Sequence, residues 1–550
     1  MKKNVLALSI AVGLLGLAGG AHAVTDPGIA AVAGSKLTNN VDGIGHILLV
    51  PYFTSQAANS TLINIVNTDT VNAKAVKVRF RGAANSDDIF DFQVFLSPAD
   101  VWAASISRGA DGRSILTTAD SSCTKPNKAT LNSTPFVTAR LDSALTGDAL
   151  AAQTREGYVE ILNMADITPT VGGVTNSLFT AVKHVANGVP PCDTAAAFTA
   201  LDVTTDKATA AWNTAGLQAP TTGLMANWTI INTVGASSWS GTADTVEARD
   251  TITNLPVAGN MVYWPQTSTP VVALTANSYT ADPLIRTDGQ TPAGGATTAA
   301  SAPAFSAGFY DFPDLSTPYT AAAGVPGAFA PLRQALSQTQ AIAAVSVTNE
   351  YLTTTTIAAT TDWTFSMPTR RYSVAMNYAA LTAGTEGRRF SELVDDGATN
   401  TLTTGFFTAG NTVVSNRQIC VTGITQIVYD REENSPTSSV GVVVSPSSPG
   451  VPTSFCGEAS VLSFNNGAPT AAGTGSLRAT VATKDITVPY ADGWMAMTTP
   501  AASGVAGVVP GGGAAVTPRG LPLLGQAFVR AVGGTGGQTF GASWGHRLGR

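Results

Sequence analysis

Charged residues are scarce in this chain of 550 residues: Asp, Glu, Lys and Arg make up 12% of it, and the formal net charge is −6. An ordinary soluble protein contains about 25% of these residues. The lysines and arginines form no basic stripe, which excludes nucleic acid as a partner. The surface is therefore expected to be rich in Thr, Ser, Asn and Gln. Weakly charged surfaces repel one another little, which favours lateral association of copies.

Recognisable catalytic motifs are also absent. The sequence contains no Gly-x-Ser-x-Gly, no Walker A loop, no His-Glu-x-x-His and no Cys-x-x-Cys-His. Of the four histidines, His22 falls in the N-terminal leader, and His46, His184 and His546 are far apart. Neither a histidine-dependent hydrolase nor a zinc site is indicated. These absences favour a protein that is not an enzyme and has no cofactor, with Ca²⁺ as the alternative.

Long apolar runs are missing beyond the N-terminus. Residues 1–23 begin with Lys2 and Lys3, continue as an apolar run and end in Ala-His-Ala, the pattern of a bacterial signal peptide. The run is shorter than the about 20 apolar residues that span a bilayer. We expect cleavage before Val24 and no transmembrane helix afterwards. The mature protein is then exported to the cell surface or the extracellular space, with the periplasm as the alternative.

The chain contains only four cysteines, all in the mature part. An even number in an exported protein favours disulfides over a metal site, and no Cys-x-x-Cys is present. Four cysteines allow three pairings. The spacing favours Cys123 with Cys192 and Cys420 with Cys456.

Short segments with alternating apolar and polar residues run through the chain. Val76, Val78 and Phe80 alternate with lysine and arginine, which predicts an antiparallel strand with one buried and one solvent-facing side. Many such strands, separated by Gly, Pro, Asn and Asp, predict a mainly β fold: a multi-strand antiparallel β-sandwich architecture with long Thr/Ala/Pro/Gly-rich loops and few short helices. The expected organisation is a signal peptide at 1–23, an N-terminal β-rich domain at 24–264, a loop-rich connecting region at 265–338 and a C-terminal β-rich domain at 339–550.

One of the short helices is expected near residue 98. Ser97 is a favourable N-cap, and Pro98 suits the first helical position. This pattern predicts a helix over residues 98–104 with Val101 and Trp102 turned inward.

A series of distinctive segments runs in order along the mature chain. They are Leu48–Phe53 (LLVPYF), Thr61–Thr68 (TLINIVNT), Ala75–Phe80 (AVKVRF), Asp91–Trp102 (DFQVFLSPADVW), Thr154–Leu162 (TREGYVEIL), Asn349–Tyr351, Thr361–Arg371 (TDWTFSMPTRR), Tyr429–Glu433 (YDREE), Gly520–Gly525 and Trp544–Arg547. Together they resemble a family of uncharacterised exported cell-surface proteins of Gram-negative bacteria. The resemblance implies one continuous architecture. It implies no reaction, so no catalytic residue is assigned.

Three neighbouring aspartates, Asp87, Asp88 and Asp91, are the candidates for a metal site. Carboxylates on loops are ligands that Ca²⁺ accepts. Their spacing differs from that of an EF-hand loop, so solvated acids in a turn are the competing interpretation.

Aromatic and basic positions give further candidates for ligand contacts. Trp239, Trp264 and Trp363 would stack on sugar rings if they were exposed, although tryptophans are highly buried on average. Arg370 and Arg371 would suit a sugar or a phosphate. The competing interpretation is that these arginines lie at strand ends and pair with Glu350 or Asp430.

Composition, export and strand content together predict an exported structural protein of the cell surface that self-associates into a surface layer, sheath or filament. Exposed sheet edges would carry the contacts between copies. The alternatives are an extracellular carbohydrate- or surface-binding (adhesion) module, and a secreted hydrolase with no recognisable motif. The expected partners are other copies or envelope components, or a polysaccharide.

Overall fold

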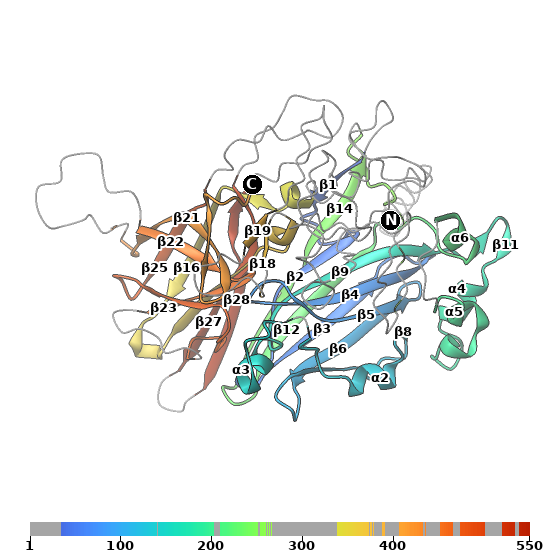
Figure 1. The fold of residues 1–550 in the computed structure, drawn as a ribbon, viewed down its shortest axis with the longest axis horizontal. Helices are drawn as coiled ribbons and strands as arrows, with labels where there is room; N and C mark the ends of the chain where they lie inside the picture. Colours follow the sequence, from blue (N-terminus) through green and yellow to red (C-terminus); the bar gives the residue numbers. More distant parts are fainter. Residues whose placement is uncertain are drawn as a thin grey trace, which may run out of the picture.

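Four large β-sheets, two in each half of the sequence, make up most of the fold in this computed structural model. Figure 1 shows the blue-to-green strands of the first half beside the yellow-to-red strands of the second half. No helix in the described residues is long and apolar enough to cross a membrane. The structure describes residues 35–139, 141–202, 209–250, 253–259, 261, 263, 266, 338–372, 374–376, 378, 388–390, 406–432, 435, 451–465, 474–500, 520–533 and 538–550.

The first half is an antiparallel sandwich of a seven-stranded and a five-stranded sheet. The large sheet contains, in spatial order, β1 (Ser35–Asn39), β14 (Asp244–Asp250), β2 (Ile47–Thr54), β9 (Glu156–Ile167), β4 (Ala73–Gly82), β5 (Asp88–Leu96) and β8 (Cys123–Lys125). The smaller sheet contains β13 (Ser237–Thr242), β12 (Leu224–Asn232), β3 (Asn59–Asn67), β6 (Val101–Arg108) and β7 (Ser114–Thr117). Side chains from both sheets, including Val50, Phe92, Ile63 and Trp102, form the core between them.

The second half is another sandwich. One sheet contains β20 (Thr412–Ser415), β21 (Gln418–Tyr429), β25 (Asp492–Thr498), β16 (Ser346–Leu352) and β29 (Arg547–Gly549), with β22 (Val451–Cys456) also paired to β21. The other contains β24 (Thr483–Thr487), β23 (Ala459–Asn465), β17 (Thr360–Ser366), β27 (Leu524–Val532) and β28 (Thr539–Gly545), where only the β23–β24 pair is parallel among the described strands. Their core includes Tyr351, Trp363, Phe365 and Met495. The predicted antiparallel β-sandwich fold is confirmed.

The remaining elements are short. The helices are α2 (Lys128–Ser133), α3 (Gly147–Ala152), α4 (Ser177–Val182), α5 (Ala196–Thr199) and α6 (Thr209–Thr214), with 3₁₀ turns η1 (Cys192–Thr194), η2 (Thr355–Ile357) and η3 (Arg370–Tyr372). Small two-stranded pairs join β10 (Thr170–Val171) to β11 (Val174–Thr175), β15 (Ala343–Ala344) to β26 (Leu521–Pro522), and β18 (Val374–Met376) to β19 (Arg388–Phe390). The predicted signal peptide lies outside the described residues, as does nearly all of the predicted connecting region.

Strand β4 corrects one expectation. Its alternation predicts a solvent-facing side, yet all ten of its residues are buried. β4 is a central strand between β9 and β5, and its basic side chains are covered by acidic partners. Arg81 pairs with Glu160 at 3.2 Å, and Lys77 pairs with Asp91.

The helix predicted over residues 98–104 is also wrong, because β6 begins at Val101 and pairs with β3. Trp102 is buried as predicted, whereas the residue before it is exposed. Ala99 has a φ of +58°, which a right-handed helix does not admit. The Asp100 carboxylate accepts the Ser97 backbone N–H at 3.0 Å. The signals that resemble a helix start therefore belong to a tight turn before a strand.

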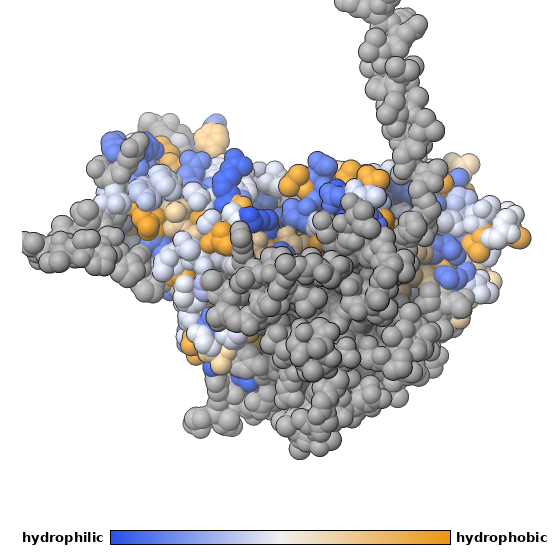
Figure 2. All heavy atoms as spheres, turned by 90° about the horizontal axis from the view of Figure 1, so that it is seen from above, coloured by the Kyte–Doolittle hydropathy of each residue, from blue (hydrophilic) through white to orange (hydrophobic). Residues whose placement is uncertain are grey.

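The two sandwiches are joined directly. The Trp239 indole N–H of β13 donates to the Val529 carbonyl of β27 at 2.8 Å. At Gly541 of β28, a Cβ atom would lie 2.3 Å from the Ser238 carbonyl oxygen, so only glycine permits this approach. On the described part of the face in Figure 2, hydrophobic residues lie in small groups among hydrophilic ones.

The structure contains both disulfides that the cysteine spacing favours. Cys420 and Cys456 face each other across β21 and β22, with Cα atoms 3.9 Å apart. Cys123 of β8 bonds to Cys192 of η1, 69 residues away in sequence. This second bridge fixes a helical segment against the edge of the large sheet.

Candidate ligand-binding cavity at the edge of the large sheet

A cavity of about 860 Å³ lies where the large sheet ends at β8. β8 pairs only with Gln93–Phe95 of β5, so the beginning of β5 extends past its neighbour. The chain then turns away from β8 into α2. We call this space the sheet-edge cavity, and its lining residues are Asp88, Phe90, Asp91, Thr124, Lys125, Pro126, Asn127, Thr130, Leu131, Thr134, Val137, Asp193, Thr199, Asp202 and Gln266.

One wall of the sheet-edge cavity is held by the first disulfide. The bond from Cys123 to Cys192 places η1 and α5 beside β8. Phe198 of α5 is fully buried, and its ring packs edge-on against Phe95 with centroids 4.9 Å apart. Asp193, Thr199 and Asp202 are thereby brought to the cavity from a segment remote in sequence.

The opposite side of the sheet-edge cavity is an apolar floor. Phe90 of β5 and Leu131 of α2 are buried and line the cavity. The Phe90 ring stacks on Phe136 with centroids 4.6 Å apart, and the Asn127 side chain caps α2 by accepting the Thr130 N–H at 3.1 Å. These contacts fix the shape of the floor without a ligand.

The acidic groups of the cavity face basic neighbours on one side. Lys125 Nζ lies 2.7 Å from Asp202 Oδ1 and 4.0 Å from the centre of the Phe198 ring. Asp91 accepts from Lys77 and, at 2.9 Å, from the Gln266 amide. Burial by itself would raise the pKa of Asp91, but the Lys77 charge and further polar contacts hold that pKa well below its usual range. Asp91 is therefore ionised at neutral pH.

Thr124 has a buried hydroxyl group in the lining of the cavity. Its side chain is buried between Cys123 and Lys125 in β8, and its Oγ1 has no hydrogen-bond partner among the described residues. A buried hydroxyl without a partner costs about 1–3 kcal/mol. Because Thr124 lines the cavity, a ligand group that reached it would remove this cost.

The aspartates predicted as calcium ligands do not come together at one point. Asp88 and Asp91 line the cavity, whereas Asp87 accepts from the Tyr378 hydroxyl of the second half. Asp91 is engaged by Lys77. The described residues contain no group of three or more His, Cys, Asp and Glu side chains arranged to hold a metal ion. A calcium site stays a prediction without support from this geometry.

The predicted aromatic contacts are partly wrong. Trp239 and Trp363 are buried, and each indole N–H donates to a backbone carbonyl, so neither can stack on a sugar. Trp264 lies outside the described residues. Arg370 binds Glu458 and Arg371 binds Glu160 inside the protein. The competing interpretation is therefore right that both arginines form ion pairs, but the partners differ from those it named.

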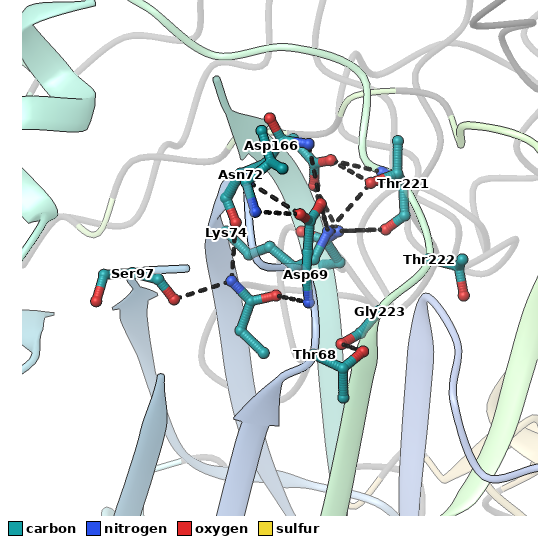
Figure 3. A network of polar contacts seen from close by, with 12 residues as sticks. Thr68, Asp69, Asn72, Lys74, Ser97, Asp166, Thr221, Thr222 and Gly223 are labelled. Atoms are coloured by element: carbon teal, nitrogen blue, oxygen red, sulfur yellow. Dashed lines mark hydrogen bonds and ion pairs between the residues drawn. The ribbon is translucent and has the colours of Figure 1, made fainter. Parts of the chain in front are cut away.

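Another polar cluster surrounds Lys74, and its charged groups bind one another. Lys74 of β4 is fully buried, and its Nζ lies 2.9 Å from Asp166 and 3.2 Å from the Thr221 carbonyl (Figure 3). Asp166 also accepts the Asn163 amide at 2.9 Å. Asp69 lies 3.8 Å from the same Nζ. We interpret this cluster as a structural link between β4, β9 and the loop before β12.

A second cavity, of about 440 Å³, lies between the two halves. Arg417, at a tight turn between β20 and β21, pairs there with Asp142 of the first half, with one nitrogen–oxygen distance of 2.7 Å. Asn85 donates to the Arg417 carbonyl at 2.9 Å. The ion pair of Arg417 and Asp142 in this second cavity thus belongs to the junction between the two halves. The larger sheet-edge cavity is the better candidate for a ligand.

Sequence reasoning missed Asp193 and Asp202 as cavity residues. The available signal was that Asp193 directly follows Cys192 and Asp202 lies ten residues after it. The disulfide partner of Cys192 precedes Thr124 and Lys125. Comparison with family models, curated proteins and solved structures finds no significant match to this chain.

Proposed function

We propose that the chain is an exported binding protein whose sheet-edge cavity takes a neutral or positively charged polyhydroxylated ligand, such as the sugar residues of a polysaccharide. The observation that carries the proposal is one cavity of about 860 Å³ that combines a preformed apolar floor with a ring of hydrogen-bonding side chains. Ligand sites of about 300–1,000 Å³ commonly have this combination.

The charges of the lining favour this class of ligand. Four aspartates and one lysine line the cavity, and the lysine is paired with Asp202. Asp91 is paired with Lys77, yet the lining still contains more carboxylates than these two lysines balance, which disfavours phosphates and sugar acids. A neutral or amino sugar would not be.

The chemistry of the side chains matches hydroxyl groups. Ionised aspartates accept hydrogen bonds, while the amides of Asn127 and Gln266 both donate and accept. Sugar hydroxyls need both kinds of partner. Phe90 and Leu131 would contact the apolar C–H faces of the ring, as the floor of the site.

Export is part of the same proposal. Disulfides form and persist in oxidising compartments, and the chain contains two. The signal-peptide pattern at residues 1–23 agrees with this location. The ligand would then be a component of the envelope or of the surroundings of the cell.

The test is titration calorimetry of the mature protein with glucose, glucosamine and galacturonic acid oligomers. Binding of a glucose or glucosamine oligomer, with no binding of the acidic oligomer, would support the proposal. Asp193→Asn and Asp202→Asn should each weaken that binding about tenfold, the loss of a charge-assisted hydrogen bond. Asp42→Asn, an exposed aspartate near the opposite edge of the sheet, should leave it unchanged. Failure of the folded wild type to bind any neutral or amino sugar contradicts the proposal.

A further inference from the structure

The six-stranded sheet of the second half presents one face to the core and the other outward. Met495, Met497 and Val347 point into the core and are buried. Residues between them in the strands point the other way, and Trp494 and Ile427 are 38% and 45% exposed. Apolar side chains that lie next to one another on an outward sheet face, unlike single exposed ones, indicate a contact surface.

A bulky row crosses this outward face. The strand register places Tyr429 of β21 opposite Trp494 of β25, and Trp494 opposite Glu350 of β16. The Tyr429 and Trp494 rings stack with centroids 4.2 Å apart and planes 12° apart. The stacked rings form a bulky aromatic pair on this face of the sheet.

A low row runs beside the bulky row. It consists of Ile427, Ala496, Thr348 and Arg547, which are register partners across β21, β25, β16 and β29. The two rows lie two residues apart along the strands, about 7 Å. The two middle positions of this row, Ala496 and Thr348, have small side chains, so the space beside Trp494 is low, with Ile427 and Arg547 at the two ends of the row.

We infer that a second copy of this chain docks on this face, around a two-fold axis that crosses the strands between the two rows. Such an axis places the bulky row of each copy over the low row of the other. Trp494 would then lie over Ala496 of the second copy, and Tyr429 against Ile427 of the second copy. A two-fold contact of this kind requires one self-complementary surface, and the two rows supply it.

The charges of the face have the same self-complementarity. Glu350 ends the bulky row, and Arg547 ends the low row. Both are exposed, and no described residue forms an ion pair with either within the chain. The two-fold axis brings Glu350 of each copy beside Arg547 of the other, which fixes the register of the contact.

This surface is separate from the proposed ligand site, which lies in the first half. It gives the self-association expected from the composition a specific place. A two-fold contact closes on itself, so a layer or filament would use this dimer as its unit together with another contact.

The test is sedimentation velocity of the full mature chain over a range of concentrations. We expect a monomer–dimer equilibrium that Glu350→Arg and Arg547→Glu each weaken about tenfold, and that the double variant restores. Trp494→Ala should also weaken it. Phe540→Ser, at a 59% exposed phenylalanine on the other sheet, should not. A wild type that stays monomeric, or a dimer that both single charge reversals leave intact, overturns the inference. Circular dichroism of each variant identifies any that fail to fold, and the restored double variant distinguishes charge pairing from misfolding.

Discussion

Arg371 of the second half donates to the Glu160 carboxylate of the first half at 3.1 Å, and both side chains are buried where the halves meet. Arg81 donates to the same carboxylate at 3.2 Å. Beside them Arg370 lies 2.6 Å from Glu458, which is also buried. The junction of the two sandwiches is therefore built on charges that compensate one another without solvent.

Replacing Glu160 should destabilise the whole protein. Glu160→Gln leaves Arg81 and Arg371 buried without their carboxylate, and such a loss costs about 3–5 kcal/mol. Urea denaturation measures the free energy of unfolding. Glu432→Gln, at an exposed glutamate outside the junction, should change that free energy by less than about 0.5 kcal/mol. Equal effects from the two substitutions would show that the buried charges do not hold the halves together.

Glu458 gives the stability a specific pH dependence. Burial raises its pKa from 4.5 to about 7, although Arg370 and Arg371 oppose the shift. Between these two values the folded protein holds the proton and the unfolded chain does not. The contribution of Glu458 to stability therefore increases as the pH falls from 7 to 4.5, by up to about 1.4 kcal/mol per pH unit.

The variant Glu458→Gln isolates this effect, because it cannot titrate. Stability of the variant minus stability of the wild type should rise steadily from pH 5 to pH 7. This difference also cancels the opposite trend from His46 and His546, whose pKa values burial lowers to about 3. A difference that is constant over this range would show that Glu458 has an ordinary pKa.

The two disulfides should have separable effects on ligand binding. Removal of either, as Cys123→Ser with Cys192→Ser or as Cys420→Ser with Cys456→Ser, should lower stability by about 4 kcal/mol. Only the first pair holds η1 and α5 against the sheet-edge cavity. Calorimetry should therefore show reduced affinity for the first double variant and wild-type affinity for the second, at a temperature where both are folded. Equal affinities of the two double variants would show that η1 and α5 do not contribute to binding.

Thr124 offers a test in which stability and binding move in different directions. Thr124→Val removes a buried hydroxyl that has no partner among the described residues, so stability should stay constant or rise by about 1 kcal/mol. Affinity for the sugar should fall about tenfold. Thr118→Val is the control, because the Thr118 hydroxyl donates to the Ala103 carbonyl at 2.6 Å. That substitution should lower stability and leave the affinity unchanged.

Local patterns predict the strands but not what covers them. The alternation of Val76 and Lys77 identifies β4 because successive side chains point to opposite faces. It cannot show that Glu160, 79 residues beyond Arg81, covers the basic face. Likewise Ser97 and Pro98 suit a helix start, and only pairing with β3 decides for a strand.

Only the part of the candidate site that is local in sequence could be predicted, because local patterns do not show contacts between distant segments. Asp88 and Asp91 stand out in the sequence because only two residues separate them. Asp193 and Asp202 reach the same cavity through a disulfide that spans 69 residues. Spacing favours that pairing, but which side chains it delivers to the sheet edge depends on the packing of Phe198 against Phe95.

The most direct test of the central claim is hydrogen–deuterium exchange of the mature protein with and without glucose or glucosamine oligomers. The account predicts slower exchange, in the presence of the bound oligomer, in the two segments that form the cavity, residues 123–134 and 192–202. The edge at β1 and β14 should be unaffected. Protection that falls elsewhere, or no protection with any of these sugars, would contradict the assignment of the sheet-edge cavity as the binding site.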